Sequence, residues 1–294
     1  MPIDRAMKVS GFTFIRNAVK YDYPVREAIM SVLPLCDEFV VSVGNSEDNT
    51  LELVRAINSP KIKIVQSVWD ESLLNGRVLA VETDKAYQAV SPDSTWAFYI
   101  QADEALHERY IDTVRTAMDR YKDDLAVDGL LFNYLHFYGS YDYVGESFSW
   151  YRREIRVIRK RADIFSYRDA QGFRKLPNEK LHVKLIDAYI YHYGWVKPPA
   201  VMRTKKNSFE TLYHGKDFVE QNGSNIEFDY NNIDVLSKFL GDHPAVFKNR
   251  IEQKNWSFDR DLSVNRLRFK DKLKRLIKNV TGWQPGEYRN YKII

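Results

Sequence analysis

The first 140 residues of this chain alternate strand-like and helix-like segments, and this alternation constrains the fold more than any other feature. Short apolar runs bounded by turn residues predict strands, whereas apolar residues spaced three and four positions apart predict helices. The predicted strands are residues 8–17, 38–44, 61–69, 95–103 and 127–138, and the predicted helices are residues 23–37, 50–58, 76–90 and 108–124. Strands separated by helices at this spacing predict an α/β, Rossmann-like fold in which helices flank a mostly parallel sheet.

The alternation ends near residue 140. Residues 139–160 and 180–196 are rich in aromatic residues and have strand-like patterns, which predicts an antiparallel extension of the sheet. Helical spacing returns in residues 200–215 and 234–256. Because no Gly-, Ser- or Pro-rich linker marks a boundary, we expect residues 1–196 to form the main domain. Residues 197–294 are then a helical C-terminal extension packed on the same domain.

Charge and cysteine content narrow the class of protein. The net charge of +4 comes from 44 basic and 40 acidic residues, a balance that argues against a nucleic-acid partner. The single cysteine, Cys36, excludes an internal disulfide, and its apolar surroundings predict core packing. The N-terminus lacks the apolar stretch of a signal peptide, and no apolar run approaches the ~18 residues that span a bilayer. These features predict a cytoplasmic protein.

Residues 263–283 form a basic segment with amphipathic spacing. Seven basic residues lie between Arg266 and Lys278 against one acid, Asp271, and the apolar residues fall on one helical face. Such a helix can lie on an anionic membrane surface, here the inner face of the membrane. The alternative is a helix packed on its own domain with a solvated basic rim.

Polar clusters follow two of the predicted strands. GNSEDNT (44–50) comes after the second strand, and QADE (101–104) comes after the fourth. In open parallel sheets, ligands bind beyond the carboxyl ends of the strands. We therefore expect both clusters to lie at one ligand-binding edge.

Several common motifs are missing. The chain has no GxGxxG after the first strand, no Walker A loop, no HExxH and no GxSxG. Their absence argues against dinucleotide-binding enzymes, P-loop NTPases, metalloproteases of the HExxH type and α/β-hydrolases.

Four stretches, in this order, carry a resemblance to a known family. They are FIRNAVKYDYPVREAIMSVLPLCDEFVVSVGNSEDNT (14–50), NGRVLAVETDKAYQA (75–89), WAFYIQADE (96–104) and YIYHYGWV (189–196). The chain resembles GT-A type glycosyltransferases of the family 2 group over residues 8–196. The resemblance implies a GT-A-like domain that binds a nucleotide-diphospho-sugar and transfers the sugar, with inversion, to a glycan or lipid-linked acceptor. It also implies a divalent cofactor, Mn²⁺ or Mg²⁺.

The resemblance further implies roles for individual residues. Asp103, from the family's DxD motif, and His192 are the expected metal ligands. The chain departs from the family pattern at two positions. Gln101 stands where the family has the first acid of DxD, and Val43 stands where the family has an acid that contacts the nucleobase. The expected nucleotide-sugar contacts are Asn45, Glu47, Asp48, Arg77, Gln101 and Asp103. The expected catalytic residues are Glu179 as general base and Glu104, with Glu146 and Asp187 as rivals.

Each of these residues also has a structural alternative. Asp103 can cap a turn, Glu104 can occupy the first turn of the next helix, and Asp48 can cap the helix predicted at 50–58. His192, like His136 and His182, can be a core histidine. On the level of the whole chain, the alternative is a noncatalytic nucleotide- or glycan-binding protein, and a glycoside hydrolase would require paired carboxylates around a sugar site.

Overall fold

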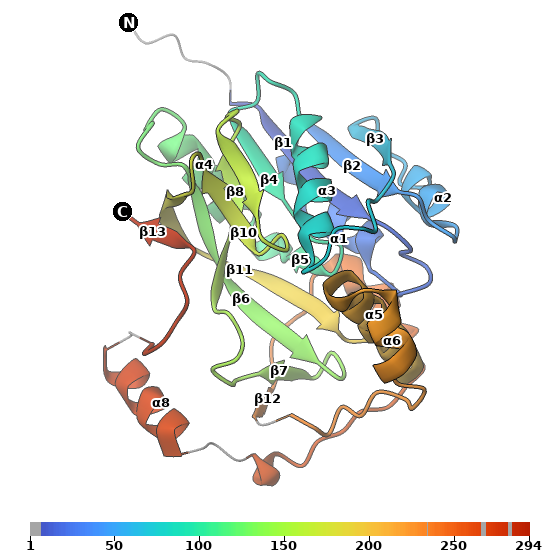
Figure 1. Cartoon of the computed structure of the whole chain (residues 1–294). Helices are drawn as coiled ribbons and strands as arrows, with labels where there is room; N and C mark the ends of the chain where they lie inside the picture. The colour runs from blue at the N-terminus through green and yellow to red at the C-terminus, as the bar shows by residue number, and fades with distance from the viewer. Residues whose placement is uncertain (1–6, 234, 266–268, 282–283) are drawn as a thin grey trace, which may run out of the picture.

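The computed structural model describes residues 7–233, 235–265, 269–281 and 284–294, and Figure 1 shows their arrangement. The strands are β1 (Val9–Ile15), β2 (Glu38–Gly44), β3 (Ile62–Ser67), β4 (Trp96–Tyr99), β5 (Glu104–Leu106), β6 (Gly129–Tyr138), β7 (Tyr143–Gly145), β8 (Arg153–Arg159), β9 (Ile164–Tyr167), β10 (Gly172–Lys175), β11 (Glu179–Trp195), β12 (Leu236–Lys238) and β13 (Tyr291–Ile293). The α-helices are α1 (Val25–Val32), α2 (Thr50–Arg55), α3 (Arg77–Gln88), α4 (Ile111–Tyr121), α5 (Pro199–His214), α6 (Lys216–Asn222), α7 (Lys248–Glu252) and α8 (Phe269–Thr281).

One large sheet runs through the molecule in the order β3-β2-β1-β4-β8-β6-β11-β10-β9. Strands β3, β2, β1 and β4 are parallel to one another, and β8 is antiparallel to both β4 and β6. Strand β11 is parallel to β6, so six strands share one direction around the reversed β8. The predicted α/β class, a mostly parallel sheet flanked by helices, is confirmed.

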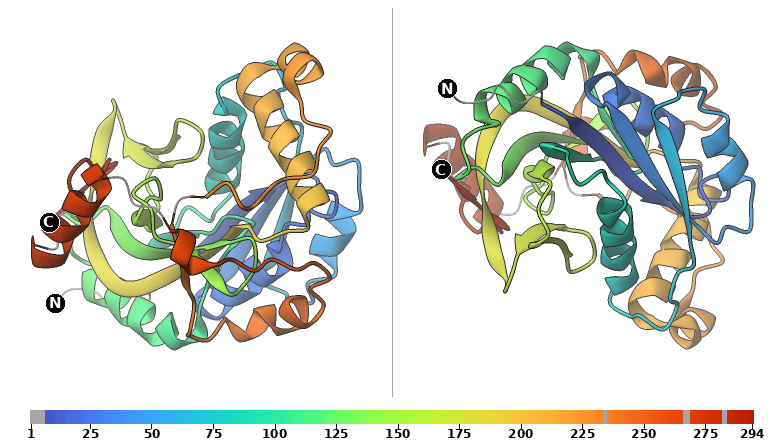
Figure 2. Two further views of the ribbon diagram at one scale, coloured as in Figure 1. Left: turned by 90° about the horizontal axis from the view of Figure 1, so that it is seen from below. Right: turned by 90° about the horizontal axis from the view of Figure 1, so that it is seen from above.

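Side chains on alternate positions of β1 face two separate cores. Val9 and Ile15 pack with Val25 and Ile29 of α1, whereas Phe12 packs with residues of α3 on the other face. This alternation follows from the two-residue period of a strand, and it lets helices cover both faces of the sheet. Figure 2 (right) shows α3 and α4 on opposite sides of the strands. Cys36 is buried in the core, as predicted.

Three expectations about individual elements need correction. The fourth strand ends at Tyr99, so residues 100–103 form a turn, and Glu104 begins strand β5 and does not lie in a helix. Residues 180–196, predicted as an antiparallel extension, form most of β11, which is antiparallel to β5 and β10 but parallel to β6. The two-residue pattern of a strand does not indicate its direction. The helix predicted at 234–256 is mostly irregular, with strand β12 near its start and only the short α7 near its end.

The C-terminal third lies against the main sheet at several points. Strand β13 pairs with β11, and β12 pairs with β7. Helices α5 and α6 lie beside α3 (Figure 1), where the backbone N–H of Gly76 donates to the carbonyl of Leu212 at 3.1 Å. No helix in the described ranges is both long and apolar enough to cross a membrane.

Candidate active site

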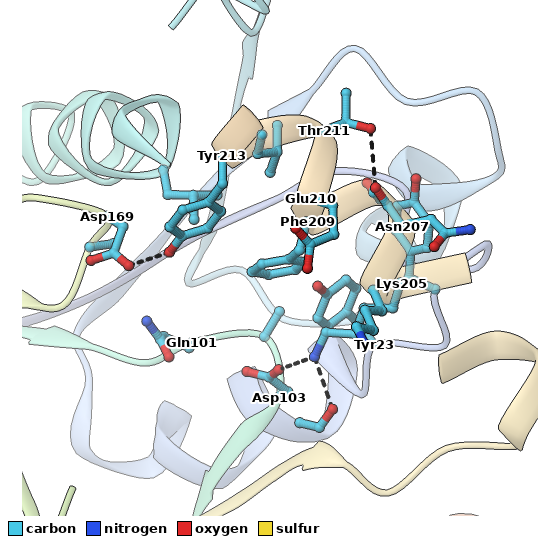
Figure 3. A pocket seen from close by; sticks show the side chains of 18 of the residues that line it. Tyr23, Gln101, Asp103, Asp169, Lys205, Asn207, Phe209, Glu210, Thr211 and Tyr213 are labelled. Carbon is cyan, nitrogen blue, oxygen red and sulfur yellow. Dashed lines mark hydrogen bonds and ion pairs between the residues drawn. The ribbon is translucent and has the colours of Figure 1, made fainter. Parts of the chain in front are cut away.

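A cleft of about 2510 Å³ opens at the carboxyl ends of the parallel strands. The residues that line it come from the end of β1, the turn after β4, the start of α3, strand β8, the end of β11 and most of α5. The QADE cluster therefore lies at the ligand-binding edge expected from the sequence. Helix α5 forms one wall, and Figure 3 shows its Lys205 reaching Asp103 and its Tyr213 reaching Asp169.

Asp103 lies at the floor of this cleft and is only 9% exposed. Its Oδ2 accepts a hydrogen bond from Nζ of Lys205 at 3.0 Å, and its Oδ1 lies 3.9 Å from Nε2 of His192. Burial opposes ionisation of this carboxyl, but the charge of Lys205, with smaller contributions from His192 and Lys197, outweighs it and lowers the pKa of Asp103. Asp103 is thus a buried carboxylate that is paired with the ammonium group of Lys205.

Glu104 belongs to the framework below this floor. Arg156 binds it with two hydrogen bonds, Nε to Oε2 at 2.8 Å and Nη2 to Oε1 at 2.7 Å. The hydroxyl of Tyr134 donates to Oε1 at 2.8 Å, and the backbone N–H of Gln101 donates to Oε2 at 3.0 Å. With four donors around a fully buried carboxylate, Glu104 fixes the turn that presents Asp103, and it has no exposed oxygen with which to act as a base.

Two histidines form a short chain behind Asp103. Nε2 of His136 lies 2.7 Å from the carbonyl of Tyr151, which can only accept, so Nε2 carries the proton. Burial, together with the charge of His192, lowers the pKa of His136 to about 3, so its Nδ1 accepts from Nδ1 of His192 at 3.0 Å. Burial also lowers the pKa of His192, although Asp103 opposes this. His192 thus lies between His136, at its Nδ1, and Asp103, whose Oδ1 is 3.9 Å from its Nε2.

Gly194 leaves the space between these groups open. A Cβ atom at this position would lie 2.5 Å from Nε2 of His192 and 2.9 Å from Oδ2 of Asp103. Its carbonyl also accepts from Lys205 at 2.9 Å. A residue without a side chain is thus required where β11 passes the floor of the cleft.

The other residues expected to bind a nucleotide sugar divide into two groups. Glu47, Arg77 and Gln101 line the cleft, as does Asp103. Asn45 and Asp48 do not line the cleft. Oδ1 of Asn45 accepts a hydrogen bond from the backbone N–H of Trp69. The carboxylate of Asp48 accepts hydrogen bonds from the backbone N–H groups of Lys20 and Thr50. Asp48 therefore stabilises the loop before α2. It is not the N-cap of that helix, because the N-cap residue is Asn49 and makes no side-chain capping bond.

The expected general base does not reach the cleft. Glu179 is exposed at the first residue of β11, next to the β10 turn, and it is not among the residues that line the cleft. Its rivals Glu146 and Asp187 are also exposed and lie outside the cleft. The sequence order places these acids near the right strands, but none of the three lines the cleft that contains Asp103.

Glu154 and Lys205 line the cleft and were missed by the sequence patterns. Glu154, on β8, is 6% exposed, and its Oε2 has no hydrogen-bond partner among the described residues. Burial, with smaller contributions from the charges of Glu104 and Asp169, raises the pKa of Glu154 to about 8, although Arg156 opposes the shift. Gly172 packs closely against this oxygen, because a Cβ there would lie only 3.1 Å from it. A buried acid with a raised pKa in the wall of a cleft, with one oxygen unpartnered among the described residues, is a candidate functional group.

A divalent cation would use Asp103 and His192, which the structure brings together. However, within the described residues no group of three or more His, Cys, Asp or Glu side chains could hold a metal ion. Nζ of Lys205 already occupies Oδ2 of Asp103, and Gln101 adds no charge where the family has an acid. These residues do not fit a resident metal, and the use of Mn²⁺ or Mg²⁺ stays a prediction.

Comparison with known proteins gives partial likenesses in structure. No protein-family model and no curated protein matches the sequence. The crystal structure of S. aureus TarS 1–349 in complex with UDP is similar over 70% of this chain and 65% of that chain, at 15% identity and a TM-score of 0.44. The glucosyl-3-phosphoglycerate synthase from Mycobacterium tuberculosis, in complex with Mn²⁺, UDP-glucose and phosphoglyceric acid, is similar over 45% of this chain and 44% of that chain, at 17% identity and a TM-score of 0.30.

The chain thus spans just under two thirds of TarS 1–349 and less than half of the synthase. Likenesses of this extent assign neither a family nor an activity. The case for a function therefore rests on the cleft itself.

Proposed function

We propose that this protein is a glycosyltransferase that moves a sugar from a nucleotide-diphospho-sugar to a hydroxyl group of a glycan or lipid-linked acceptor. The observation that carries the proposal is the buried Asp103 with its paired cation at the floor of a large cleft, at the carboxyl ends of the parallel strands. Nucleotide ligands of open α/β sheets bind at this edge. The sequence resemblance to GT-A glycosyltransferases points to the same reaction.

The donor diphosphate would lie between the end of β1 and the start of α3. Arg16 and Lys20 follow β1, and Arg77 is the first residue of α3; all three line the cleft. Guanidinium and ammonium groups bind phosphate oxygens through charge-assisted hydrogen bonds. The N-terminus of α3 adds a partial positive charge at the same place.

The acceptor would enter beside β8, where Glu154, in place of Glu179, would act as the general base. An inverting transfer needs a base for the proton of the attacking hydroxyl, and such a base works best when its pKa lies near the operating pH. Glu154, with its pKa raised to about 8 and one unpartnered oxygen, has this property. Tyr151 and Trp150 also line this part of the cleft and offer aromatic surface for a sugar ring.

We also propose that the protein works in the cytoplasm, at the inner face of the membrane, through α8. Residues 266–268 and 282–283 of the predicted 263–283 contact lie outside the described residues. Within α8, Leu273, Leu276 and Val280 are 52%, 61% and 77% exposed, and Lys270 and Lys272 are exposed too. Apolar side chains beside basic ones suit a surface of anionic lipid.

Vesicle flotation tests this contact. The wild type is expected to float with vesicles of phosphatidylcholine and phosphatidylglycerol but not with phosphatidylcholine alone, and Leu276→Glu should abolish flotation. Leu125→Glu, at a leucine after α4 that is 77% exposed, is the control and should behave as wild type. Equal flotation of wild type and Leu276→Glu would remove the proposed contact.

A noncatalytic nucleotide-binding protein remains the second candidate, because Gln101 replaces an acid of the family motif. A donor screen separates the two functions. Purified protein is incubated with UDP-, GDP-, CDP- and dTDP-sugars, and release of the nucleoside diphosphate is followed. A transferase releases nucleotide from at least one donor and loses this activity in Asp103→Asn, whereas a binding protein releases none.

A further inference from the structure

The ammonium group of Lys205 occupies the position at Asp103 where the family resemblance expects a metal ion. Nζ lies 3.0 Å from Oδ2 of Asp103 and 2.9 Å from the carbonyl oxygen of Gly194 (Figure 3). The rings of Tyr23 and Phe209 flank it, at 4.9 and 5.6 Å from their centroids. The side chain is 12% exposed, so this cation is buried and paired on several sides.

Helix α5 holds Lys205 in place. The carbonyls of Leu212 and Tyr213, near the C-terminal end of the helix, accept hydrogen bonds from the backbone N–H groups of Gly76 and Asn75, at 3.1 and 3.2 Å. The hydroxyl of Tyr213 donates to Asp169 across the cleft. The helix is therefore tied to the loop before α3 and to the loop between β9 and β10, and the ammonium group is a fixed charge of the cleft.

Lys205 retains capacity for a ligand. An ammonium group has three N–H donors, and the two hydrogen bonds above use two of them. The amide of Gln101, which also lines the cleft, offers N–H donors where a carboxylate would repel a diphosphate. A metal ion would need anionic ligands here, whereas an ammonium group and an amide bind phosphate oxygens directly.

We propose that Lys205, oriented by Asp103, neutralises the leaving diphosphate in place of a divalent metal ion, so that nucleotide binding needs no added metal. This inference rests on the proposed function. In the transfer, the bond between the anomeric carbon and the diphosphate oxygen breaks, and its electron pair stays on that oxygen, to which Lys205 donates a hydrogen bond. The acceptor oxygen forms the new bond to the anomeric carbon and gives its proton to the base. Lys205 keeps its own protons throughout.

Isothermal titration of UDP, GDP, CDP and dTDP, in EDTA and in MnCl₂, tests the inference. We expect the wild type to bind at least one of these nucleotides with the same affinity in both buffers. Lys205→Met should weaken this binding by about tenfold or more, since a charge-assisted contact to phosphate is lost. Lys205→Arg, which keeps the charge, should retain part of the affinity and shows that the loss does not come from misfolding. Lys292→Met, at an exposed lysine on β13 outside the cleft, should bind as the wild type.

The possible failures are distinguishable. If the wild type binds nucleotide only with Mn²⁺, or if Lys205→Met binds as tightly as the wild type, the Lys205 inference is wrong and the proposed function stands. If the wild type binds none of the four nucleotides in either buffer, both the Lys205 inference and the proposed nucleotide binding are wrong.

Discussion

Replacing Arg156 by methionine is expected to lower the free energy of unfolding by about 3–5 kcal/mol, the usual cost of leaving a buried charge without its partner. Arg156 is 1% exposed and Glu104 is fully buried, so the remaining carboxylate cannot reach water. The change would also free the turn at Gln101, whose backbone N–H donates to Glu104. Urea denaturation followed by tryptophan fluorescence measures the effect.

Arg115→Met is the matched control for this prediction. Arg115 pairs with Asp112 at 2.9 Å on the surface of α4, where such a pair contributes at most about 1 kcal/mol. The double variant Arg156→Met/Glu104→Gln should recover part of the loss, because it leaves no unpaired charge. Equal destabilisation by Arg156→Met and Arg115→Met would show that the buried pair does not hold the floor of the cleft.

Replacing Glu154 by glutamine is expected to lower the transfer rate by about 10²–10⁴-fold, the usual contribution of a general base. In the wild type the rate should rise with pH through about 8, because Glu154 must lose its proton before it can accept one. Arg156 favours the ionised form, whereas Glu104 and Asp169 oppose it. Glu154→Gln should lose both the activity and this pH dependence. Glu146→Gln, at an exposed glutamate outside the cleft, is the control and should keep both.

Stability gives a second readout for Glu154 that needs no substrate. Its pKa is about 8 in the folded protein against 4.5 in the unfolded chain, so the folded state binds more protons between these values. Stability of the wild type is then lost as the pH rises from about 5 to about 8, whereas glutamine has no such dependence. Glu154→Gln should therefore gain about 3–4 kcal/mol relative to the wild type across this range. A pH-independent difference between the two proteins would contradict a raised pKa.

The sequence predicts the parallel part of the sheet well, because its strands are short, apolar and separated by helices with clear spacing. The reversed β8 and the parallel β11 follow less directly, since a period of two residues indicates a strand but not its direction or its neighbour. The apolar residues of the irregular stretch before α7 lie at helical intervals, so the sequence predicts a helix there. There the chain instead packs Phe247 against Tyr193 of the sheet, at 4.1 Å between ring centroids.

The site shows the same division between local and distant information. Asp103 and Gln101 could be found because a local motif at a strand end marks them. Lys205 could not, because 102 residues separate it from Asp103 and no pattern links them. Arg156 likewise lies 52 residues from Glu104. A charged residue in a strand, such as Glu154, predicts a solvent-facing position, and only the tertiary structure shows that Glu154 is buried. Contacts of this kind need the tertiary structure.

Release of a nucleoside diphosphate from a nucleotide-diphospho-sugar tests the central claim most directly. We expect the wild type to release nucleotide from at least one donor, and Gly194→Ala to release none while its thermal unfolding stays cooperative, because the added Cβ would fill the space between His192 and Asp103. A wild type that releases nucleotide from no donor, or a Gly194→Ala variant as active as the wild type, would contradict the assignment of this cleft as a glycosyltransferase active site.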